Sequence, residues 1–352
     1  MVTKLSIATP GGHILRSLAI LGKNYGKGDS AECFPERESS VMDRITWPDG
    51  KDFAFTVFDD TDFATVENVG SVYAFLRDQG LRTTKSIWPV QGNYAMVNGE
   101  EQGSTCDDQE YLAWVQELQR DGFEIGYHNT TFHSSTREQI IKGTDKFAEM
   151  FAHYPTSLAQ HQADEAIYWG DRRISGVNAL IYNLLTMYKQ RGISKGHIES
   201  SEYFWGDICK NRFKYVRNFV FPDINTLEAC PEMPYHDRKR PDVNYWFASS
   251  EGPIAASFNS CISEPAQDRL EADGGACIMY THFAKGFFDG RELDRRFIAL
   301  TKRLSRKNGW FVPVSTLLDY LLEIKGHHDI KNSERGRLER KWLLHKIRVG
   351  TT

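Results

Sequence analysis

Residues 53–62 read FAFTVFDDTD, an apolar run that ends in three carboxylates. Apolar residues predominate on both faces at a period of two, which predicts a strand buried on both sides within a parallel sheet. Asp59, Asp60 and Asp62 follow at its carboxyl end, where charges are costly unless they are paired, solvated or bound to a metal. Reacting groups of α/β folds collect at that end of the sheet. This stretch therefore predicts a charged site at the strand ends.

Strand-like and helix-like segments alternate from residue 53 to residue 325. Short apolar runs predict strands at 53–59, 84–90, 123–128, 156–161, 195–199, 216–221, 243–248, 276–282 and 310–312. Helical spacing of apolar residues predicts helices at 66–79, 107–121, 135–151, 175–191, 263–273, 291–307 and 315–324. Repeated β-then-α units predict a parallel sheet, either a barrel or doubly wound. We expect residues 51–325 to form this core and residues 1–50 to be an extension that wraps it.

Residues 326–352 have a different composition, with an excess of Lys and Arg over Asp and Glu. Leu338, Trp342, Leu343 and Ile347 can share one face of a helix, so the segment is a basic amphipathic tail. Such helices usually cover a core, and we expect this one to pack on the barrel or on a partner subunit in a homo-oligomer. Weak contact with a membrane surface is the alternative.

Composition excludes several classes of protein. The net charge of −4 over 352 residues provides no basic footprint for nucleic acid. No run of 18 apolar residues exists, so no transmembrane helix is expected. Pro10, Gly11, Gly12 and Arg16 interrupt any apolar core of a signal peptide, and the six cysteines lack a C-x-x-C motif. These features favour a cytoplasmic protein with reduced thiols.

Histidines follow several of the predicted strands. The run FEIGYH ends at His128 with His133 just beyond, SLAQH ends at His161, and CIMYTH ends at His282. For any one of these histidines, a hydrogen-bonded core or surface position is the alternative to a functional role. Convergence of several in one fold weakens that alternative. Carboxylates from one strand end and imidazoles from others are the ligands expected for a divalent metal.

Such a set of residues suits hydrolysis of an amide. One carboxylate and two neutral imidazoles would hold Zn²⁺ or a similar ion and leave positions open for water and substrate. The cation would lower the pKa of bound water from about 15.7 toward about 7. A second carboxylate would accept the water's proton as it attacks a carbonyl. A histidine on the far side would donate a proton to the leaving nitrogen.

In these motifs the chain resembles the NodB-like polysaccharide deacetylases, carbohydrate esterase family four, over roughly residues 50–325. The resemblance implies a distorted (β/α) barrel of about seven parallel strands. It also implies that Asp59 is the catalytic base, that Asp60, His128 and His133 bind the metal, and that His282 is the acid. Zn²⁺ is the expected ion, with Co²⁺, Ni²⁺ and Mn²⁺ as alternatives.

The chain departs from the family pattern at three places. The histidines are spaced H-x4-H in place of the family's H-x3-H. The segment HQADEAIYWG stands where the family has R-x-P, so His161 would replace the arginine or serve the metal. FWGD is the nearest counterpart of the family's Asp-Trp signature. These departures indicate a divergent branch. The substrate-binding candidates are Asp62, His161, Trp169, Trp205 and Asp207.

The predicted function is a metal-dependent carbohydrate deacetylase, a hydrolase of carbon–nitrogen bonds other than peptide bonds. It would remove an N-acyl group, first of all acetyl, from an amino sugar of a polysaccharide or glycan precursor. A catalytically inactive carbohydrate-binding or scaffold protein on the same fold is the alternative, motivated by the histidine spacing and the missing arginine. A metal-independent glycosidase that uses Asp59 with another carboxylate is a third reading.

Overall fold

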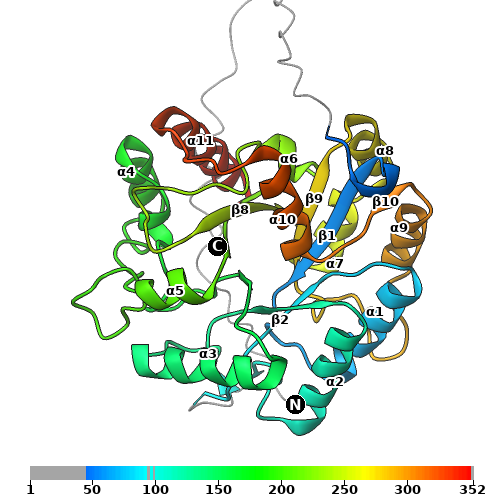
Figure 1. Ribbon diagram of the computed structural model, residues 1–352, viewed down its shortest axis with the longest axis horizontal. Helices are drawn as coiled ribbons and strands as arrows, with labels where there is room; N and C mark the ends of the chain where they lie inside the picture. Colours follow the sequence, from blue (N-terminus) through cyan, green and yellow to red (C-terminus); the bar gives the residue numbers. More distant parts are fainter. Residues whose placement is uncertain (1–44, 93–95, 98–99, 350–352) are drawn as a thin grey trace, which may run out of the picture. The chain divides into compact units, whose positions relative to one another are not determined.

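Seven parallel strands close into a barrel in the computed structural model, which describes residues 45–92, 96–97 and 100–349. In spatial order they are β1 (Phe53–Asp59), β2 (Thr84–Ile87), β5 (Glu124–Tyr127), β6 (Ser157–Leu158), β7 (Tyr215–Phe221), β8 (Tyr245–Glu251) and β9 (Ala276–Thr281). Pairing of β9 with β1 completes the ring (Figure 1). This arrangement confirms the expected distorted (β/α) barrel of about seven strands.

β1 is the strand on which the barrel closes. It pairs with β9 along its length, from Ala54 opposite Ala276 to Asp59 opposite Thr281, and with β2 at its carboxyl end. All seven of its residues are buried, because neighbouring strands and helices cover both faces. This burial explains the absence of polar alternation in its sequence. Since every strand of the ring runs the same way, the carboxyl ends of all seven meet at one rim.

The described residues contain three further short strands outside the seven-stranded ring. β10 (Gly309–Trp310) pairs with the start of β1, and β3 (Met96–Val97) and β4 (Glu100–Glu101) form a separate antiparallel pair. Residues 45–50 lead into the barrel through the 3-10 turn η1 (Pro48–Gly50). Trp47 is buried there, and its Nε1 donates to the carbonyl oxygen of Gly274 at 3.0 Å. The rest of the extension expected over residues 1–50 lies outside the described residues.

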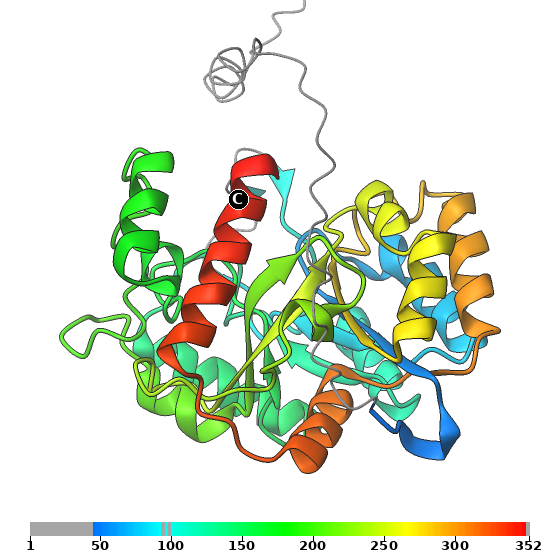
Figure 2. The same cartoon turned by 90° about the horizontal axis from the view of Figure 1, so that it is seen from above.

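Helices surround the ring of strands (Figures 1 and 2). They are α1 (Val66–Asp78), α2 (Gln109–Arg120), α3 (Arg137–Phe151), α4 (Gly176–Leu185), α5 (Gly206–Arg212), α6 (Thr226–Ala229), α7 (Ala255–Cys261), α8 (Glu264–Asp273), α9 (Arg295–Ser305), α10 (Val314–Lys325) and α11 (Asn332–Val349). The 3-10 turn η2 (Gly170–Arg173) precedes α4. Local signals set the bounds of α2: Asp108 caps its first turn, and Gly122 reverses the chain at a φ of +89°.

One of the predicted strands is absent from the structure, so that prediction is wrong. Residues 195–199 form turns in the structure. The amide of Lys195 donates to the carbonyl oxygen of Asp164, which ties the segment to a neighbouring loop. A Cβ added at Gly196 would lie 2.0 Å from the carbonyl oxygen of Glu165, so this position requires glycine. The apolar character of the segment therefore serves loop packing and not a sheet.

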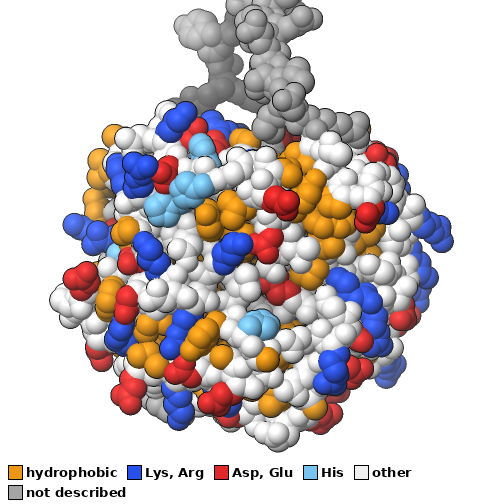
Figure 3. All heavy atoms as spheres, in the orientation of Figure 1, with side chains coloured by type: hydrophobic (Ala, Val, Ile, Leu, Met, Phe, Trp, Pro, Cys, Tyr) orange, Lys and Arg blue, Asp and Glu red, His pale blue; other side chains and the backbone are white. Residues whose placement is uncertain are grey.

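The exterior was predicted to lack the features of a membrane-spanning or nucleic-acid-binding protein. Within the described ranges, no helix combines the length and the apolar character that a membrane crossing requires. On the face drawn in Figure 3, basic and acidic side chains are interspersed, without a broad field of one sign.

The C-terminal helix α11 packs beside α4 and against β7 (Figure 2). Leu338, Trp342 and Leu343 are buried, whereas Ile347 of the same expected face is 41% exposed. The ring of Trp342 lies 5.7 Å from that of Phe219 on β7. Aromatic pairs at this separation add to the energy of burial. The tail beyond residue 326 thus forms part of the wall of the described fold.

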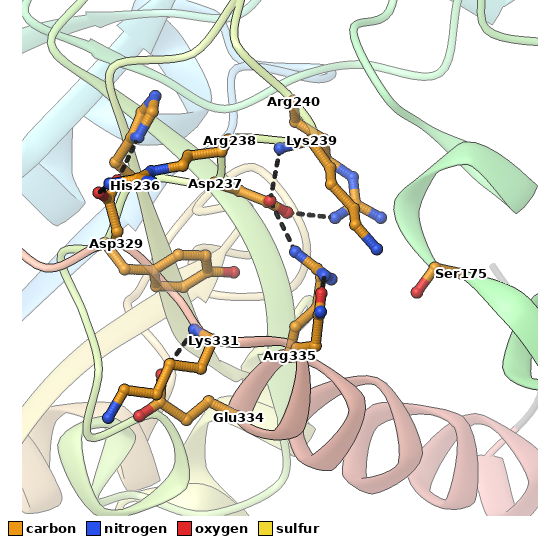
Figure 4. A network of polar contacts seen from close by, with 12 residues as sticks. Ser175, His236, Asp237, Arg238, Lys239, Arg240, Asp329, Lys331, Glu334 and Arg335 are labelled. Carbon is orange, nitrogen blue, oxygen red and sulfur yellow. Dashed lines mark hydrogen bonds and ion pairs between the residues drawn. The ribbon is translucent and has the colours of Figure 1, made fainter.

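A buried ion-pair network anchors α11 at its first turns (Figure 4). The Asp237 side chain is 2% exposed, and its oxygens accept hydrogen bonds from Arg240 at 2.5 Å and from Arg335 of α11 at 2.7 Å. Nearby, Asp329 pairs with Arg238, whose side chain is 80% exposed. Because water screens the second pair and not the first, only the first should contribute strongly to stability.

We therefore predict different costs for two aspartate substitutions in this network. Asp237→Ala leaves two buried guanidinium groups without their carboxylate, and should lower the free energy of unfolding by about 3–5 kcal/mol. Asp329→Ala is the matched control and should change it far less, because that pair is solvated. Urea unfolding followed by circular dichroism measures both. Equal losses would contradict the assignment of the anchor to Asp237.

Candidate metal and catalytic site

The three aspartates at the end of β1 lie in three different environments. Asp59 is fully buried. Its carboxylate accepts hydrogen bonds from the Tyr73 hydroxyl and the Phe283 amide, each at 2.8 Å, and pairs with Lys85 Nζ at 3.1 Å. These donors enclose both oxygens within the wall, and Asp59 does not line the pocket described below. The structure thus places Asp59, the expected base, in the barrel wall and outside the lining of this pocket.

Asp60 pairs with Arg217, which comes from β7 on another side of the barrel. The guanidinium donates to both carboxylate oxygens, at 2.8 and 2.5 Å, and both side chains are almost fully buried. Burial alone would raise the pKa of Asp60, but the charges of Arg217, His128 and His282 and the hydrogen bonds from Arg217 together outweigh it, and the pKa is lowered. Asp60 is therefore an ionised carboxylate of fixed orientation at physiological pH.

Asp62 lies among three imidazoles that come from three other strand ends. Its Oδ2 is 3.0 Å from His282 Nε2, and its Oδ1 is 3.4 Å from His161 Nδ1 and 3.7 Å from His128 Nε2. Burial opposes ionisation, yet contacts with His128 and His282 hold the pKa of Asp62 well below its usual range. The carboxylate that the structure places beside the imidazoles is that of Asp62, whereas the sequence analysis assigned this position to Asp60.

The environment of His128 fits a metal ligand. Its Nδ1 lies 2.7 Å from the carbonyl oxygen of Ala159, so this nitrogen carries a proton and Nε2 is the nitrogen that would bind a cation. Nε2 is buried and has no hydrogen-bond partner in the described structure. One ligand atom each of Asp62, His128 and His161 lies within 4.8 Å of the other two. A carboxylate oxygen and two imidazole nitrogens form a donor set that suits Zn²⁺.

His133 lies apart from this set. Its Nδ1 is 2.9 Å from the carbonyl oxygen of Ser134, and its ring packs on Phe132. A Cβ added at Gly92 would lie 2.0 Å from His133 Nε2, so this nitrogen faces the loop at residue 92. The additional residue of the H-x4-H spacing turns His133 out of the group. His161, expected to bind substrate or serve the metal, occupies the position beside Asp62 and His128.

His282 faces hydrogen-bond acceptors at both ring nitrogens. Its Nδ1 lies 2.9 Å from the carbonyl oxygen of Pro253, and its Nε2 lies 3.0 Å from Asp62 Oδ2. Only the doubly protonated ring can donate to both acceptors. The position of His282 therefore suits a group that holds a proton at Nε2, next to the candidate metal ligands.

These groups line a pocket at the carboxyl rim of the barrel, with a cavity volume of about 180 Å³. Asp60, Asp62, His128, His161, Trp169 and His282 are among its lining residues. Further members are residues that the sequence analysis did not assign to the site, namely Arg173, Arg217, Tyr280, Glu251 and Lys346. Arg217 carried a recognisable signal, because a cation within the apolar strand YVRNFVF must find a buried partner.

Two of the expected substrate-binding residues lie outside the pocket. Trp205 is buried in the core, where its Nε1 donates to the carbonyl oxygen of Glu165 at 2.6 Å. Asp207 lies in the first turn of α5 and forms an ion pair with Arg137, with contacts of 2.6 and 2.7 Å. Core packing and surface pairing account for these residues, so FWGD is a structural segment. Trp169 does line the pocket.

Comparisons with known proteins find solved structures that are similar to this chain. No protein-family model matches the chain, and no curated protein matches it in sequence. It is similar in structure to a Mycobacterium smegmatis protein assigned as a polysaccharide deacetylase, with 11% identity, a TM-score of 0.46 and coverage of 82% of this chain and 96% of that one. It is also similar to the Puue allantoinase, with 11% identity, a TM-score of 0.45 and coverage of 83% of this chain and 98% of that one.

The polysaccharide deacetylase of Bacillus cereus is a further similar structure, with 10% identity, a TM-score of 0.32 and coverage of 80% of this chain and 93% of that one. Polysaccharide deacetylases, the group that the sequence motifs resemble, are thus among the similar solved structures. At these identities and TM-scores the likeness concerns the fold, and the assignment of residues depends on the contacts described above.

The contacts of His128, His161 and His133 generate a test of the metal site. His128→Ala or Asp62→Asn removes a donor from the group and should lower Zn²⁺ affinity at least tenfold, because loss of even a residue that only orients a ligand typically costs about 10–100-fold. His133→Ala, a histidine control from the same loop, should leave affinity unchanged. Titration with a competing chelator measures the affinity. Loss of binding in His133→Ala with retention in His161→Ala would contradict this ligand set.

The enclosure of Asp59 generates a separate prediction. Asp59→Asn leaves the buried Lys85 ammonium without its counter-charge and should lower the free energy of unfolding by about 3–5 kcal/mol. Zn²⁺ affinity of the folded protein should stay within a fewfold of the wild-type value, because Asp59 is not part of the group around Asp62. Urea unfolding and chelator titration check the two halves. An unaltered stability would show that Asp59 is not a structural residue.

Proposed function

We propose that the chain is a metal-dependent hydrolase that removes an N-acyl group, with acetyl as the first candidate, from an amino sugar. The observation that carries this proposal is the convergence of Asp62, His128 and His161 beside Asp60 and His282 in one pocket. This arrangement unites a metal-ligand set with an ionised carboxylate and a proton-bearing imidazole. A carbohydrate substrate and a cytoplasmic location are parts of the same proposal.

In this proposal Asp62, His128 and His161 hold the divalent cation. One carboxylate and two imidazoles are typical of catalytic zinc sites, and Co²⁺, Ni²⁺ and Mn²⁺ remain the alternative ions. When bound, such a cation polarises an amide carbonyl and lowers the pKa of a coordinated water. The hydrogen bond from His128 Nδ1 to the Ala159 carbonyl keeps the ring in the tautomer that this role requires.

Asp60 is the proposed proton acceptor. Its carboxylate lines the pocket, and its pairing with Arg217 holds it ionised and in one orientation. A carboxylate has about four acceptor positions, so two remain for a water molecule after the guanidinium has taken two. General-base catalysis typically contributes about 10²–10⁴-fold to the rate. Asp59, the expected base, is buried behind Asp60 and pairs with Lys85 in the barrel wall.

His282 is the proposed proton donor to the leaving nitrogen. Its Nε2 faces Asp62 at the pocket, and its Nδ1 faces the Pro253 carbonyl. Transfer of the Nε2 proton leaves a neutral ring that still donates from Nδ1, so the ring keeps its orientation through the reaction. Placement of Asp60 and His282 in one small pocket allows one group to take a proton while the other gives one.

The role of Asp60 generates a prediction about turnover. Asp60→Asn should lower kcat for acetate release from N-acetylated amino sugars by at least about 100-fold, because an amide cannot accept the proton. Asp207→Asn is a control for the loss of an arginine pair outside the pocket, since Asp207 also forms a two-contact pair with an arginine, and this pair is exposed. Zn²⁺ content should be equal in both variants. Enzymatic detection of acetate provides the rate.

Three outcomes would contradict this function. Wild-type turnover in Asp60→Asn would remove the proposed base. Failure of the wild-type, Zn²⁺-loaded protein to release any acid from a panel of acylated amino sugars would favour the noncatalytic carbohydrate-binding alternative. Activity that survives complete removal of the metal would instead favour hydrolysis by carboxylates alone.

A further inference from the structure

Arg173 is a buried cation that no carboxylate neutralises in the described structure. It ends η2, is 6% exposed and lines the same pocket as Asp60 and Asp62. Its Nε and Nη2 are buried and have no hydrogen-bond partner. Among the described ion pairs, none includes Arg173. A guanidinium with buried, unsatisfied N–H groups is costly, so its retention requires a reason.

Neighbouring buried arginines are all paired. Arg217 binds Asp60, and both Arg240 and Arg335 bind Asp237. Lys346, a buried cation that α11 brings to the pocket, pairs with Glu251 at 2.7 Å. The described residues therefore supply an acid for each of these cations and none for Arg173. The unmatched charge lies in a wall of the pocket that already holds the proposed reacting groups.

Aromatic packing fixes the position of Arg173 without satisfying its N–H groups. Its Cζ lies 3.7 Å above the ring of Trp169 and 5.2 Å from that of Trp342 of α11. A desolvated cation–π contact offsets only part of the cost of burying an ion. Burial and the nearby charges of Arg217 and Arg240 lower the pKa of Arg173 to about 10, so it still carries its charge at neutral pH.

We propose that Arg173 binds an anionic group of the substrate, a carboxylate or a phosphate, and that the substrate is a small acidic acyl amide. This inference rests on the proposed function and specifies its substrate class. A planar guanidinium presents parallel N–H donors that match either group. The cavity of about 180 Å³ lies below the roughly 300–1,000 Å³ of common ligand pockets, so it suits one small unit rather than a stretch of polymer.

Anion binding tests the proposal without requiring hydrolysis. Isothermal titration calorimetry with inorganic phosphate and with glucuronate is applied to the full chain, before and after metal removal. The measurement after metal removal excludes binding of the anion to the metal ion. We expect both or one of these anions to bind, and Arg173→Met to weaken that binding at least tenfold after metal removal. Arg238→Met, at an exposed arginine, is the control and should bind as the wild type does. The anion that binds more tightly shows whether Arg173 recognises a phosphate or a carboxylate of the substrate.

Two results of this titration would overturn the proposal. One is that neither phosphate nor glucuronate binds to the wild-type protein. The other is equal binding by the wild type and Arg173→Met, which would assign the anion to Arg217 or Lys346. Arg173→Lys keeps the charge but not the paired donors, and should bind more tightly than Arg173→Met and less tightly than the wild type.

Stability separates anion binding from a purely structural role for the stacked guanidinium. If Arg173 serves the substrate, Arg173→Met removes an unpaired buried charge, and the urea midpoint should stay the same or rise. If it serves packing between Trp169 and Trp342, the midpoint should fall while anion affinity is unaltered. The second pattern would overturn the proposal even though the variant folds.

Kinetics connects the inference to the proposed reaction. We expect the wild type to deacetylate N-acetylglucosamine 6-phosphate or N-acetylmuramate with a higher kcat/KM than N-acetylglucosamine. Arg173→Met should raise KM for the acidic substrate at least tenfold with little change in kcat. Preference for the neutral sugar would overturn the acidic substrate class while the hydrolase proposal survives. Absence of all turnover together with Arg173-dependent anion binding would overturn the hydrolase and leave the anion site.

Discussion

The ion pair between Asp60 and Arg217 organises the site because it crosses the barrel. Asp60 follows β1 and Arg217 lies on β7, so one bidentate contact joins two elements more than 150 positions apart in the chain. Neither charge could remain buried without the other, since an isolated buried ion costs several kcal/mol. Once Arg217 has taken Asp60, the next carboxylate along the chain, Asp62, is left to face the imidazoles. The division of roles among the aspartates therefore begins with this pair.

Sequence patterns predicted the rim of the site well because parallel strands leave little freedom there. An apolar run that ends in carboxylates, and others that end in histidines, must bring those side chains to one end of the barrel. The same patterns could not distinguish Asp59, Asp60 and Asp62, because their environments depend on Lys85 and Arg217, which come from other strands. Contacts across the barrel, and not local spacing, decide which carboxylate is enclosed, paired or open to the pocket.

The histidines and the FWGD segment also show that local spacing could not assign the residues of the site. Spacing along the chain made His133 the natural partner of His128, but one additional residue turns it toward the loop at residue 92. His161 reaches Asp62 from the next strand, and only the order of strands in the barrel could reveal that. Trp205 has an aromatic ring of the kind that stacks on sugars, yet it is buried in the core. Sequence alone could not separate the two roles, because aromatic residues serve packing as well as binding.

The C-terminal helix joins the stability of the fold to the chemistry of the pocket. Asp237 anchors α11 at its start, and the helix then carries Trp342 and Lys346 to the wall that contains Arg173. A helix that served only to cover apolar surface would not need to bring a second cation to this wall. Because Glu251 neutralises Lys346 and nothing described neutralises Arg173, the positive charge of the wall is concentrated at one guanidinium. An acidic substrate would complete the pairing that the chain leaves open, and binding energy gained there would hold the scissile amide beside Asp60 and His282.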